Sequence, residues 1–209
     1  MAVGRRVRAR RGLVAAPLRP FRREVPMIDV VRCAWGDSTP DYRDYHDTEW
    51  GVELHGDAEL FERMCLESFQ SGLSWITILR KRENFRRAFA DFDPVVVAGY
   101  DDADFDRLMA DASIVRNRAK INAAVANARV LAAMDEPLDD LLWSFAPKTH
   151  VRPATIADVP AVTAESKAMA KELKRRGFVF LGPITCYALM QATGMVDDHV
   201  ATCFRAIDR

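Results

Sequence analysis

The segment covering residues 57–71 constrains the fold most, because it predicts a helix whose inward face includes a carboxylate. Leu60, Met64 and Glu67 recur at helical spacing, which places all three side chains on one side of that helix. An ionised carboxylate that is buried without a partner is costly, so Glu67 needs a cationic neighbour, a raised pKa or a polar cavity. The alternative is that Glu67 only borders the apolar stripe and pairs with an arginine of another helix.

A glycine and two large apolar side chains follow this segment. Gly72 is expected to end the helix, and Leu73 and Trp75 come directly after it. A second helix is predicted over residues 75–89, where large side chains again recur on one face.

Strand-like alternation is scarce along the chain, and glycine and proline number only ten each in 209 residues, so we expect an all-α fold. Further helical patterns lie over residues 102–110, from about residue 117, over 163–176 and from residue 183. No stretch approaches the length of apolar sequence that spans a membrane. Residues 27–209 are therefore expected to form a single helical domain, most simply a monomer.

The first 26 residues differ in composition from the rest of the chain. They contain eight arginines and one glutamate and show no helical periodicity, so we expect residues 1–26 to be a disordered tail. A translation start assigned too early, a transit peptide and a nucleic-acid-binding arm are the other interpretations. The remaining 183 residues have a net charge of −7, so any binding of nucleic acid by this part must be local.

Aromatic residues are concentrated near the start of the predicted domain. Within sixteen positions lie Trp35, Tyr42, Tyr45 and Trp50. Any one of them could simply pack this irregular segment onto the helices. Four together, beside potential metal ligands, favour a lined pocket.

Cysteine and histidine residues near the two ends of the domain form a possible metal site. His199 and Cys203 are four residues apart, and Cys33 and His46 supply a complementary pair, which gives a set suited to a structural zinc ion. The alternative is that these are buried free cysteines and structural histidines. Four cysteines without a secretion signal favour a reducing compartment such as the cytoplasm over a disulfide framework.

A short turn over residues 111–115 separates two helical patterns and is followed by three basic residues, Arg116, Arg118 and Lys120. Free amide groups at a helix start attract anions, so this arrangement suits a phosphate. It resembles the helix-hairpin-helix element that holds the DNA backbone, with Ser113 at a position where glycine is usual. An ordinary turn with surface arginines is the alternative.

Several segments, taken together and in order, resemble the DNA-3-methyladenine glycosylase I family over about residues 30–205. They are RCAW (32–35), DYHDTEWG (44–51), LFERMCLESFQSGLSWITILRKRENFRRAF (60–89), FDP (92–94), IVRNRAKI (114–121), LWSF (142–145), RRGFVFLGPITCYALMQATGMVDDHV (175–200) and the final cysteine at 203. The resemblance implies an all-α fold of the helix-hairpin-helix DNA glycosylase superfamily, with a zinc ion joining the N- and C-terminal segments. It also implies removal of 3-methyladenine from alkylated double-stranded DNA.

The same resemblance implies roles for individual residues. Glu67 would recognise the base, Trp75 would stack on it, and further pocket walls would come from Trp35, Tyr42, Tyr45 and Trp50. One structural zinc ion would be bound by Cys33, His46, His199 and Cys203.

Two further hypotheses concern the DNA. Leu73 would fill the gap that a flipped nucleotide leaves, and Gln70 would hydrogen-bond the opposite strand. The ionised Glu67 would accept hydrogen bonds from a cationic adduct, and whether it also acts as a base towards water stays open at this stage.

Other functions are compatible with parts of the pattern. A non-enzymatic, zinc-stabilised helix-hairpin-helix DNA-binding protein would use the same hairpin and metal site, but would not need a buried glutamate facing aromatic residues. A zinc hydrolase would need an open coordination position. A glycosylase of broader specificity would accept bulkier adducts such as 7-methylguanine.

Overall fold

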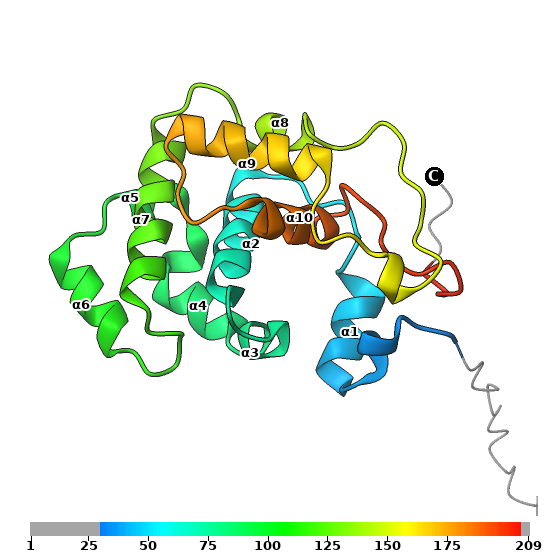
Figure 1. Ribbon diagram of the computed structural model, residues 1–209. Coiled ribbons are helices and arrows are strands. Elements are labelled where there is room, and N and C mark those ends of the chain that lie inside the picture. Colours follow the sequence, from blue (N-terminus) through cyan, green and yellow to red (C-terminus); the bar gives the residue numbers. More distant parts are fainter. Residues whose placement is uncertain (1–29, 206–209) are drawn as a thin grey trace, which may run out of the picture.

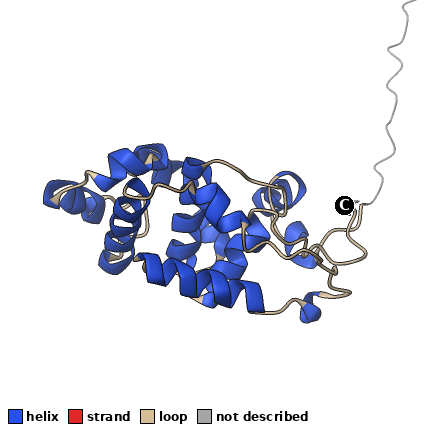
Figure 2. Cartoon of the chain, turned by 90° about the horizontal axis from the view of Figure 1, so that it is seen from above, coloured by secondary structure: helices blue, strands red, loops and turns tan. Residues whose placement is uncertain are grey.

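The computed structural model describes residues 30–205, and every regular element in that range is helical (Figures 1 and 2). The α-helices are α1 Pro40–Thr48, α2 Asp57–Gln70, α3 Trp75–Leu79, α4 Arg82–Ala88, α5 Pro94–Ala98, α6 Asp102–Ala110, α7 Arg118–Ala132, α8 Leu138–Trp143, α9 Ala164–Arg176 and α10 Pro183–Ala192. Short 3-10 helices cover Ala34–Asp37, Ala90–Phe92 and Ile156–Asp158. The predicted all-α fold is confirmed for this range, and the predicted tail, residues 1–26, lies outside it.

None of the helices between residues 30 and 205 has both the length and the apolar character needed to cross a membrane.

Helix α2 has the bounds that its sequence predicts to within one residue. At its start the Gly56 amide donates to Asp139 Oδ2 at 2.6 Å, and the Asp139 amide donates in return to Asp57 Oδ1 at 3.0 Å. At its end Gly72 has a φ of 79°, a left-handed conformation that glycine adopts without strain. The start of the helix is therefore held by a residue that is distant in the sequence, whereas the turn after its end depends on a local glycine.

Helix α2 lies at the centre of the hydrophobic core, and helices α3, α7, α8 and α10 pack against it. Its fully buried side chains are Leu60, Phe61, Met64, Leu66 and Phe69. Glu67 is only 5% exposed and belongs to the same inward face. The predicted burial of this carboxylate is therefore confirmed.

Capping side chains explain where most of the other predicted helices begin. The Asp93 carboxylate accepts hydrogen bonds from the Val95 and Val96 amides at the start of α5, and the Asn117 side chain accepts one from the Lys120 amide at the start of α7. Helix α9 ends at Gly177, which has a φ of 101°. The start of α7 near residue 117 and the end of α9 after residue 176 agree with the sequence-based predictions.

The prediction of a single helix over residues 75–89 is wrong. The chain forms two short helices, α3 and α4, which are separated by Arg80 and Lys81. At the break the Lys81 ammonium donates to the Ser113 carbonyl at 2.8 Å, and Arg82 forms two hydrogen bonds to Glu49. Both partners are distant in the sequence. The helical periodicity continues across the break, so sequence spacing alone does not reveal it.

The two ends of the described chain lie side by side, and Figure 1 shows the last residues beside α1 and the segment that precedes it. The Phe204 amide donates to the Val31 carbonyl at 2.8 Å. The long connector between α8 and α9 reaches the same region, where Arg152 pairs with Asp197 at 2.7 Å. This end of the molecule is therefore assembled from three segments that are far apart in the sequence.

Candidate functional site

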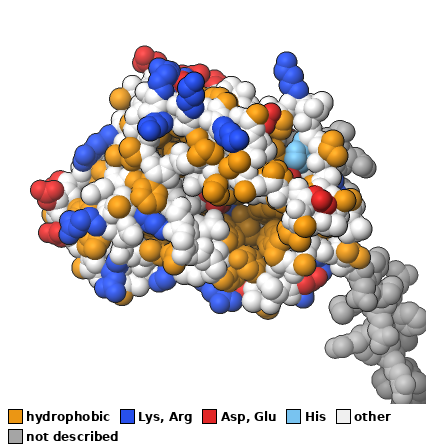
Figure 3. All heavy atoms as spheres, viewed as in Figure 1, with side chains coloured by type: hydrophobic (Ala, Val, Ile, Leu, Met, Phe, Trp, Pro, Cys, Tyr) orange, Lys and Arg blue, Asp and Glu red, His pale blue; other side chains and the backbone are white. Residues whose placement is uncertain are grey.

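A cavity of about 260 Å³ opens between α1, α2, α3, α10 and the connector that precedes α9. Figure 3 shows the hollow, with hydrophobic side chains along its wall. Its lining residues are Trp35, Tyr42, Tyr45, Trp50, Glu67, Gln70, Trp75, Ile156, Val159, Ala188 and Gln191. The structure thus brings together all five aromatic residues and the glutamate that the sequence analysis selected for a pocket.

Four lining residues were not selected from the sequence. Ala188 and Gln191 are three residues apart on α10, a spacing that puts them on one face, but a single such pair carries no distinctive signal. Ile156 and Val159 lie in the proline-containing connector, where no periodicity indicates burial. Gln70, which the sequence analysis assigned to the opposite DNA strand, lies in the cavity wall.

The aromatic rings contact one another along the wall, edge to face at Trp35 and tilted between Tyr45 and Trp75. Trp35 contacts Tyr42 and Trp50 with ring centroids 5.5 and 5.0 Å apart, and Tyr45 contacts Trp75 at 5.4 Å. Such pairs favour fixed ring orientations, so the wall presents flat apolar faces without first having to rearrange. Trp75 Nε1 is buried without a hydrogen-bond partner in the described chain.

Glu67 reaches the cavity from the buried face of α2. No donor within residues 30–205 forms a hydrogen bond or ion pair with its carboxylate, which is unusual for a buried acidic group. Burial raises the pKa of Glu67 to about 7, and the charge of Arg63 opposes that rise. Near neutral pH the carboxylate therefore exchanges a proton readily and has unused hydrogen-bonding capacity.

Arg63, one turn before Glu67 on α2, holds the aromatic wall in place. Its guanidinium donates to the Tyr45 hydroxyl at 3.1 Å and lies over the Tyr45 and Trp75 rings, 5.6 and 5.8 Å from their centroids. It also pairs with Glu49 at 3.5 Å. The alternative interpretation, in which Glu67 pairs with an arginine of another helix, does not hold, because no arginine within residues 30–205 forms an ion pair with it.

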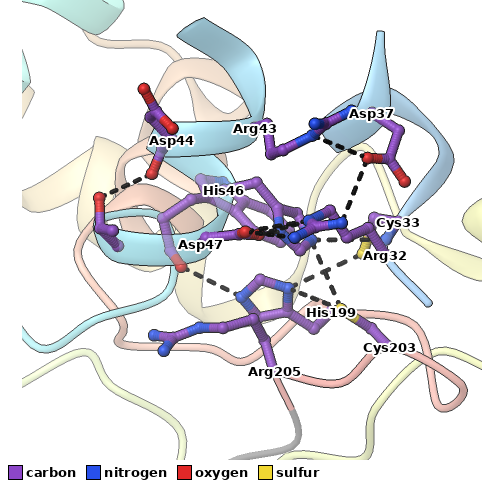
Figure 4. A network of polar contacts seen from close by, with 12 residues as sticks. Arg32, Cys33, Asp37, Arg43, Asp44, His46, Asp47, His199, Cys203 and Arg205 are labelled. Atoms are coloured by element: carbon purple, nitrogen blue, oxygen red, sulfur yellow. Dashed lines mark hydrogen bonds and ion pairs between the residues drawn. The ribbon is translucent and has the colours of Figure 1, made fainter. Parts of the chain in front are cut away.

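Next to the cavity, the four predicted metal ligands converge (Figure 4). Cys33, His46, His199 and Cys203 are all buried, and one ligand atom from each lies within 4.8 Å of the others. Cys203 Sγ is 3.4 Å from His46 Nε2 and 3.6 Å from His199 Nδ1, and Cys33 Sγ is 3.7 Å from His199 Nδ1. This group could hold one metal ion.

The second nitrogen of each histidine is fixed by a neighbour. His46 Nδ1 lies 2.8 Å from Asp47, whose carboxylate binds Arg32, and His199 Nε2 lies 3.1 Å from the Trp50 carbonyl. Burial lowers the pKa of His199 to about 4 and raises that of Cys33 to about 11. The site thus keeps His199 neutral, as a metal ligand must be, while the thiol of Cys33 would need a cation to ionise.

The Trp50 carbonyl connects the two features, because Trp50 lines the cavity and its backbone contacts His199. Its ring centroid is 4.7 Å from that of His199. Trp35, another lining residue, has its ring centroid 5.1 Å from that of His46, so a change at the cysteine and histidine group would reach the cavity wall through both tryptophans.

The predicted hairpin lies between α6 and α7. Arg116 and Arg118 are exposed there, and the Arg118 guanidinium lies 4.5 Å from the centroid of the Phe105 ring. Ser113 does not have a positive φ, so the strain expected from a non-glycine residue is absent at this position. Its amide donates to Asp111 at 2.8 Å and its carbonyl accepts from Lys81, so both backbone groups are used within the protein.

Lys120 does not lie where the sequence analysis expected it. Its ammonium is buried and donates to the Phe69 carbonyl at 2.8 Å and the Ser71 carbonyl at 2.6 Å. These are backbone acceptors that the carboxyl end of α2 leaves without helical partners. Lys120 therefore caps α2 from the inside and does not face a phosphate on the surface.

Leu73 follows the carboxyl end of α2 and is 42% exposed. It comes three residues after Gln70 in the cavity wall, and the left-handed Gly72 lies between them.

The chain is similar to a known family over nearly all of the described range. A family profile described as methyladenine glycosylase matches residues 35–206, which include every lining residue of the cavity. DNA-3-methyladenine glycosylase 1 of Escherichia coli (strain K12) is 47% identical over 180 residues, which cover 83% of this chain and 96% of that protein.

Solved structures agree with this similarity. A crystal structure of 3-methyladenine DNA glycosylase I matches with a TM-score of 0.81 at 44% identity, over 84% of this chain and 99% of that one. A variant of 3-methyladenine DNA glycosylase I in complex with 3-methyladenine matches with a TM-score of 0.80 at 34% identity, over 85% of this chain and 98% of that one.

Proposed function

The chain belongs to the methyladenine glycosylase family, and from this premise we propose that it hydrolyses the N-glycosidic bond of 3-methyladenine in alkylated double-stranded DNA. The observation that carries the proposal is the cavity with aromatic walls around a buried carboxylate that has no hydrogen-bond partner in the described chain. A site of that kind suits a flat, cationic ligand with an amine edge.

Recognition would depend on charge. Methylation at N3 makes the adenine ring cationic, and a cation is attracted by aromatic faces such as that of Trp75. An ionised Glu67 would accept hydrogen bonds from the exocyclic amine, a charge-assisted contact in a site with little water. Neutral adenine lacks the charge and would not compensate the cost of ionising a buried carboxylate.

The target nucleotide would leave the duplex before it enters the cavity. Flipping costs less for a base whose stacking and pairing a methyl group and a positive charge have already weakened. Leu73 would occupy the gap in the stack, and Gln70, at the cavity wall, is the candidate for hydrogen bonds to the unpaired base of the other strand.

The chemical step needs only modest help. The bond between C1′ of the sugar and N9 of the base breaks, and the electron pair leaves with the base as neutral 3-methyladenine. A water oxygen adds to C1′, and the proton that this water loses is released to solvent. The carboxylate of Glu67 would stabilise positive charge that develops on the sugar as well as hold the base. Recognition of the base and catalysis would then both require the ionised form of Glu67.

We also propose that the buried cysteine and histidine group binds one structural zinc ion. A tetrahedral zinc ion with bonds of about 2.3 Å to sulfur and about 2.0 Å to nitrogen separates its ligand atoms by roughly 3.5 Å. The observed separations of 3.4, 3.6 and 3.7 Å between sulfur and nitrogen atoms fit that geometry. With four protein ligands the ion would have no open position, so it would join chain ends and take no part in the reaction.

The DNA backbone would be held at the α6–α7 hairpin. Arg116 and Arg118 are exposed beside the amino end of α7, where unpaired amide groups and the helix dipole favour a phosphate. Lys120 and the Ser113 amide are excluded from this surface by the contacts they make within the protein.

The experiment that tests the proposal is release of free bases from methylated duplex DNA by the purified chain, with the products separated by chromatography. We expect 3-methyladenine as the main product and intact DNA containing abasic sites. A folded protein that binds methylated duplex and releases no base would instead be a DNA-binding module of the same fold.

A further inference from the structure

The link between α9 and α10, residues 178–182, holds an exposed phenylalanine in a left-handed backbone conformation. Phe180 has a φ of 65° and is 42% exposed. A residue with a Cβ atom is strained in this region, and a large apolar side chain in water gains nothing from burial. Phe92 has a similar φ of 57°, but its ring is fully buried in the core, and packing offsets the strain there. No comparable burial offsets it at Phe180.

Buried groups fix this conformation from several sides. The side chain of Asn127, which is 1% exposed, accepts from the Val179 amide at 2.8 Å and donates to the Val179 carbonyl at 3.1 Å. Phe178 and Leu181, on either side of the exposed pair Val179 and Phe180, are both buried. A core asparagine that binds both the amide and the carbonyl of Val179 restrains the two peptide units on either side of that residue, directly before the exposed Phe180.

The link lies beside the cavity. The Phe180 carbonyl is 3.5 Å from Ser68 Oγ, next to Glu67 on α2. Helix α10 begins directly after the link and supplies Ala188 and Gln191 to the cavity wall. Figure 3 shows hydrophobic side chains on the same face as the hollow.

Four exposed apolar residues at the ends of these elements form what we call the apolar rim: Leu73, Val179, Phe180 and Ile184. Ile184 is 67% exposed and lies one helical turn before Ala188 on α10. The rim residues therefore belong to the segments that supply the cavity wall: Leu73 follows α2, which carries Glu67 and Gln70, and Ile184 lies at the amino end of α10.

We propose that the apolar rim contacts the bases of duplex DNA and that Phe180 enters the base stack next to the nucleotide whose base occupies the cavity. The proposal rests on the proposed function, since it needs a flipped nucleotide. Apolar side chains that insert at a base step unstack it and bend the duplex, which assists extrusion of a neighbouring base. Leu73 and Phe180, on separate segments, would then hold the distorted duplex at two points.

The Phe180→Gly variant distinguishes a side chain that inserts into DNA from one that only stabilises the fold, because glycine adopts a φ of 65° without strain. For Phe180→Gly we expect an unchanged or higher melting temperature and unchanged binding of free 3-methyladenine. We expect excision from duplex DNA to fall by about tenfold or more, because the assistance to flipping is lost. On the same adduct in single-stranded DNA, where no stack has to be opened, the loss should be much smaller.

Two controls accompany this variant. Phe180→Leu keeps an apolar side chain and should retain most of the duplex activity. Val95→Ala removes exposed apolar surface from α5, outside the rim, and should change neither activity nor binding. The affinity of each variant for duplex DNA that contains a tetrahydrofuran abasic-site analogue measures the contact between the residue at position 180 and DNA. No bond is cleaved in this measurement.

Equal excision and equal affinity for Phe180→Gly and the parent chain would overturn the proposal. A parallel fall in melting temperature and in activity on single-stranded DNA would overturn it too, because it would make Phe180 a structural residue. If the parent chain released no base at all, the proposed function would fail, and the affinity ratio for the abasic-site duplex would still decide whether Phe180 contacts DNA.

Discussion

In the function that we propose, the ionisation of Glu67 determines which bases the cavity holds. Its carboxylate is desolvated by the core that surrounds α2. Arg63, the one cation between residues 30 and 205 whose charge lowers the pKa of Glu67, is engaged with Tyr45 and Glu49. A bound cationic base would supply the missing counter-charge and favour the ionised form of Glu67 over the protonated form. The same burial that disfavours the empty, ionised site would therefore favour a cationic ligand over a neutral one of the same shape.

This burial predicts how stability depends on pH. The pKa of Glu67 is about 7 in the folded chain against an ordinary value of 4.5, so the folded state retains a proton that the unfolded state loses between these values. The contribution of Glu67 to the free energy of unfolding is fully present below pH 4.5 and is lost as pH rises through about 7. Glutamine has no such dependence, so Glu67→Gln should gain up to about 3 kcal/mol relative to the parent between pH 5 and pH 8.

Urea unfolding of both proteins at the two pH values checks this, and the difference between them cancels the titration of other groups. A constant difference at pH 5 and pH 8 would contradict the assigned pKa.

Residue spacing predicted the inward position of Glu67, because Leu60 and Met64, which define the buried face, are on the same helix. The position of Lys120 was not predictable in this way. Its acceptors, the carbonyls of Phe69 and Ser71, are 51 and 49 residues away, and basic residues on either side of it suggest a surface cluster. Local sequence carries no information about a partner that only the tertiary fold supplies.

At the level of elements, α2 depends on that lysine for its carboxyl end. Lys120→Met keeps most of the side-chain volume but leaves the two carbonyls without their donor, so we expect a loss of about 3 kcal/mol in the free energy of unfolding. Lys171→Met, on the exposed face of α9, is the matched control and should change it by less than about 0.5 kcal/mol. Urea titrations measure both values, and equal stability of the two variants would show that Lys120 does not cap α2.

Helices with capping residues were predictable, and elements shaped by distant contacts were not. Asp93, Asn117 and Thr163 each mark a helix start by hydrogen-bonding nearby amides, a purely local effect. The break between α3 and α4 coincides with contacts to Ser113 and Glu49, and it interrupts a continuous helical pattern. For the same reason Ile156, in an irregular connector, reaches the cavity without any sequence signal.

At the level of the whole molecule, the metal group joins the beginning of the domain to its end. Cys33 and His199 are 166 residues apart, and the cavity residues Trp35 and Trp50 lie between the two N-terminal ligands or just after them. Closing so long a loop removes much conformational freedom from the unfolded chain. The sequence predicted this group because cysteine and histidine are rare in the chain, with four of each, and because His199 and Cys203 are one helical turn apart.

Removal of the ion should therefore loosen both the ends and the cavity. We expect one zinc ion per chain by native mass spectrometry, and none or weakly bound zinc in Cys203→Ser. Chelator-treated parent and Cys203→Ser should show a similar fall in melting temperature, whereas Cys186→Ala, which changes a buried cysteine outside the group, should keep its ion. A parent chain without metal, or a Cys203→Ser variant that binds zinc as the parent does, would contradict the assignment.

We propose that the unpaired carboxylate of Glu67 selects and holds the cationic base. The most direct test is the rate at which Glu67→Gln releases 3-methyladenine from methylated duplex DNA. Glu59→Gln, an exposed change on the same helix, is the control. We predict that Glu67→Gln remains folded and loses about a hundredfold or more in rate, as expected when a charge-assisted contact to the reacting group is removed, while Glu59→Gln matches the parent. Release by Glu67→Gln at the parental rate would show that the cavity works without this carboxylate.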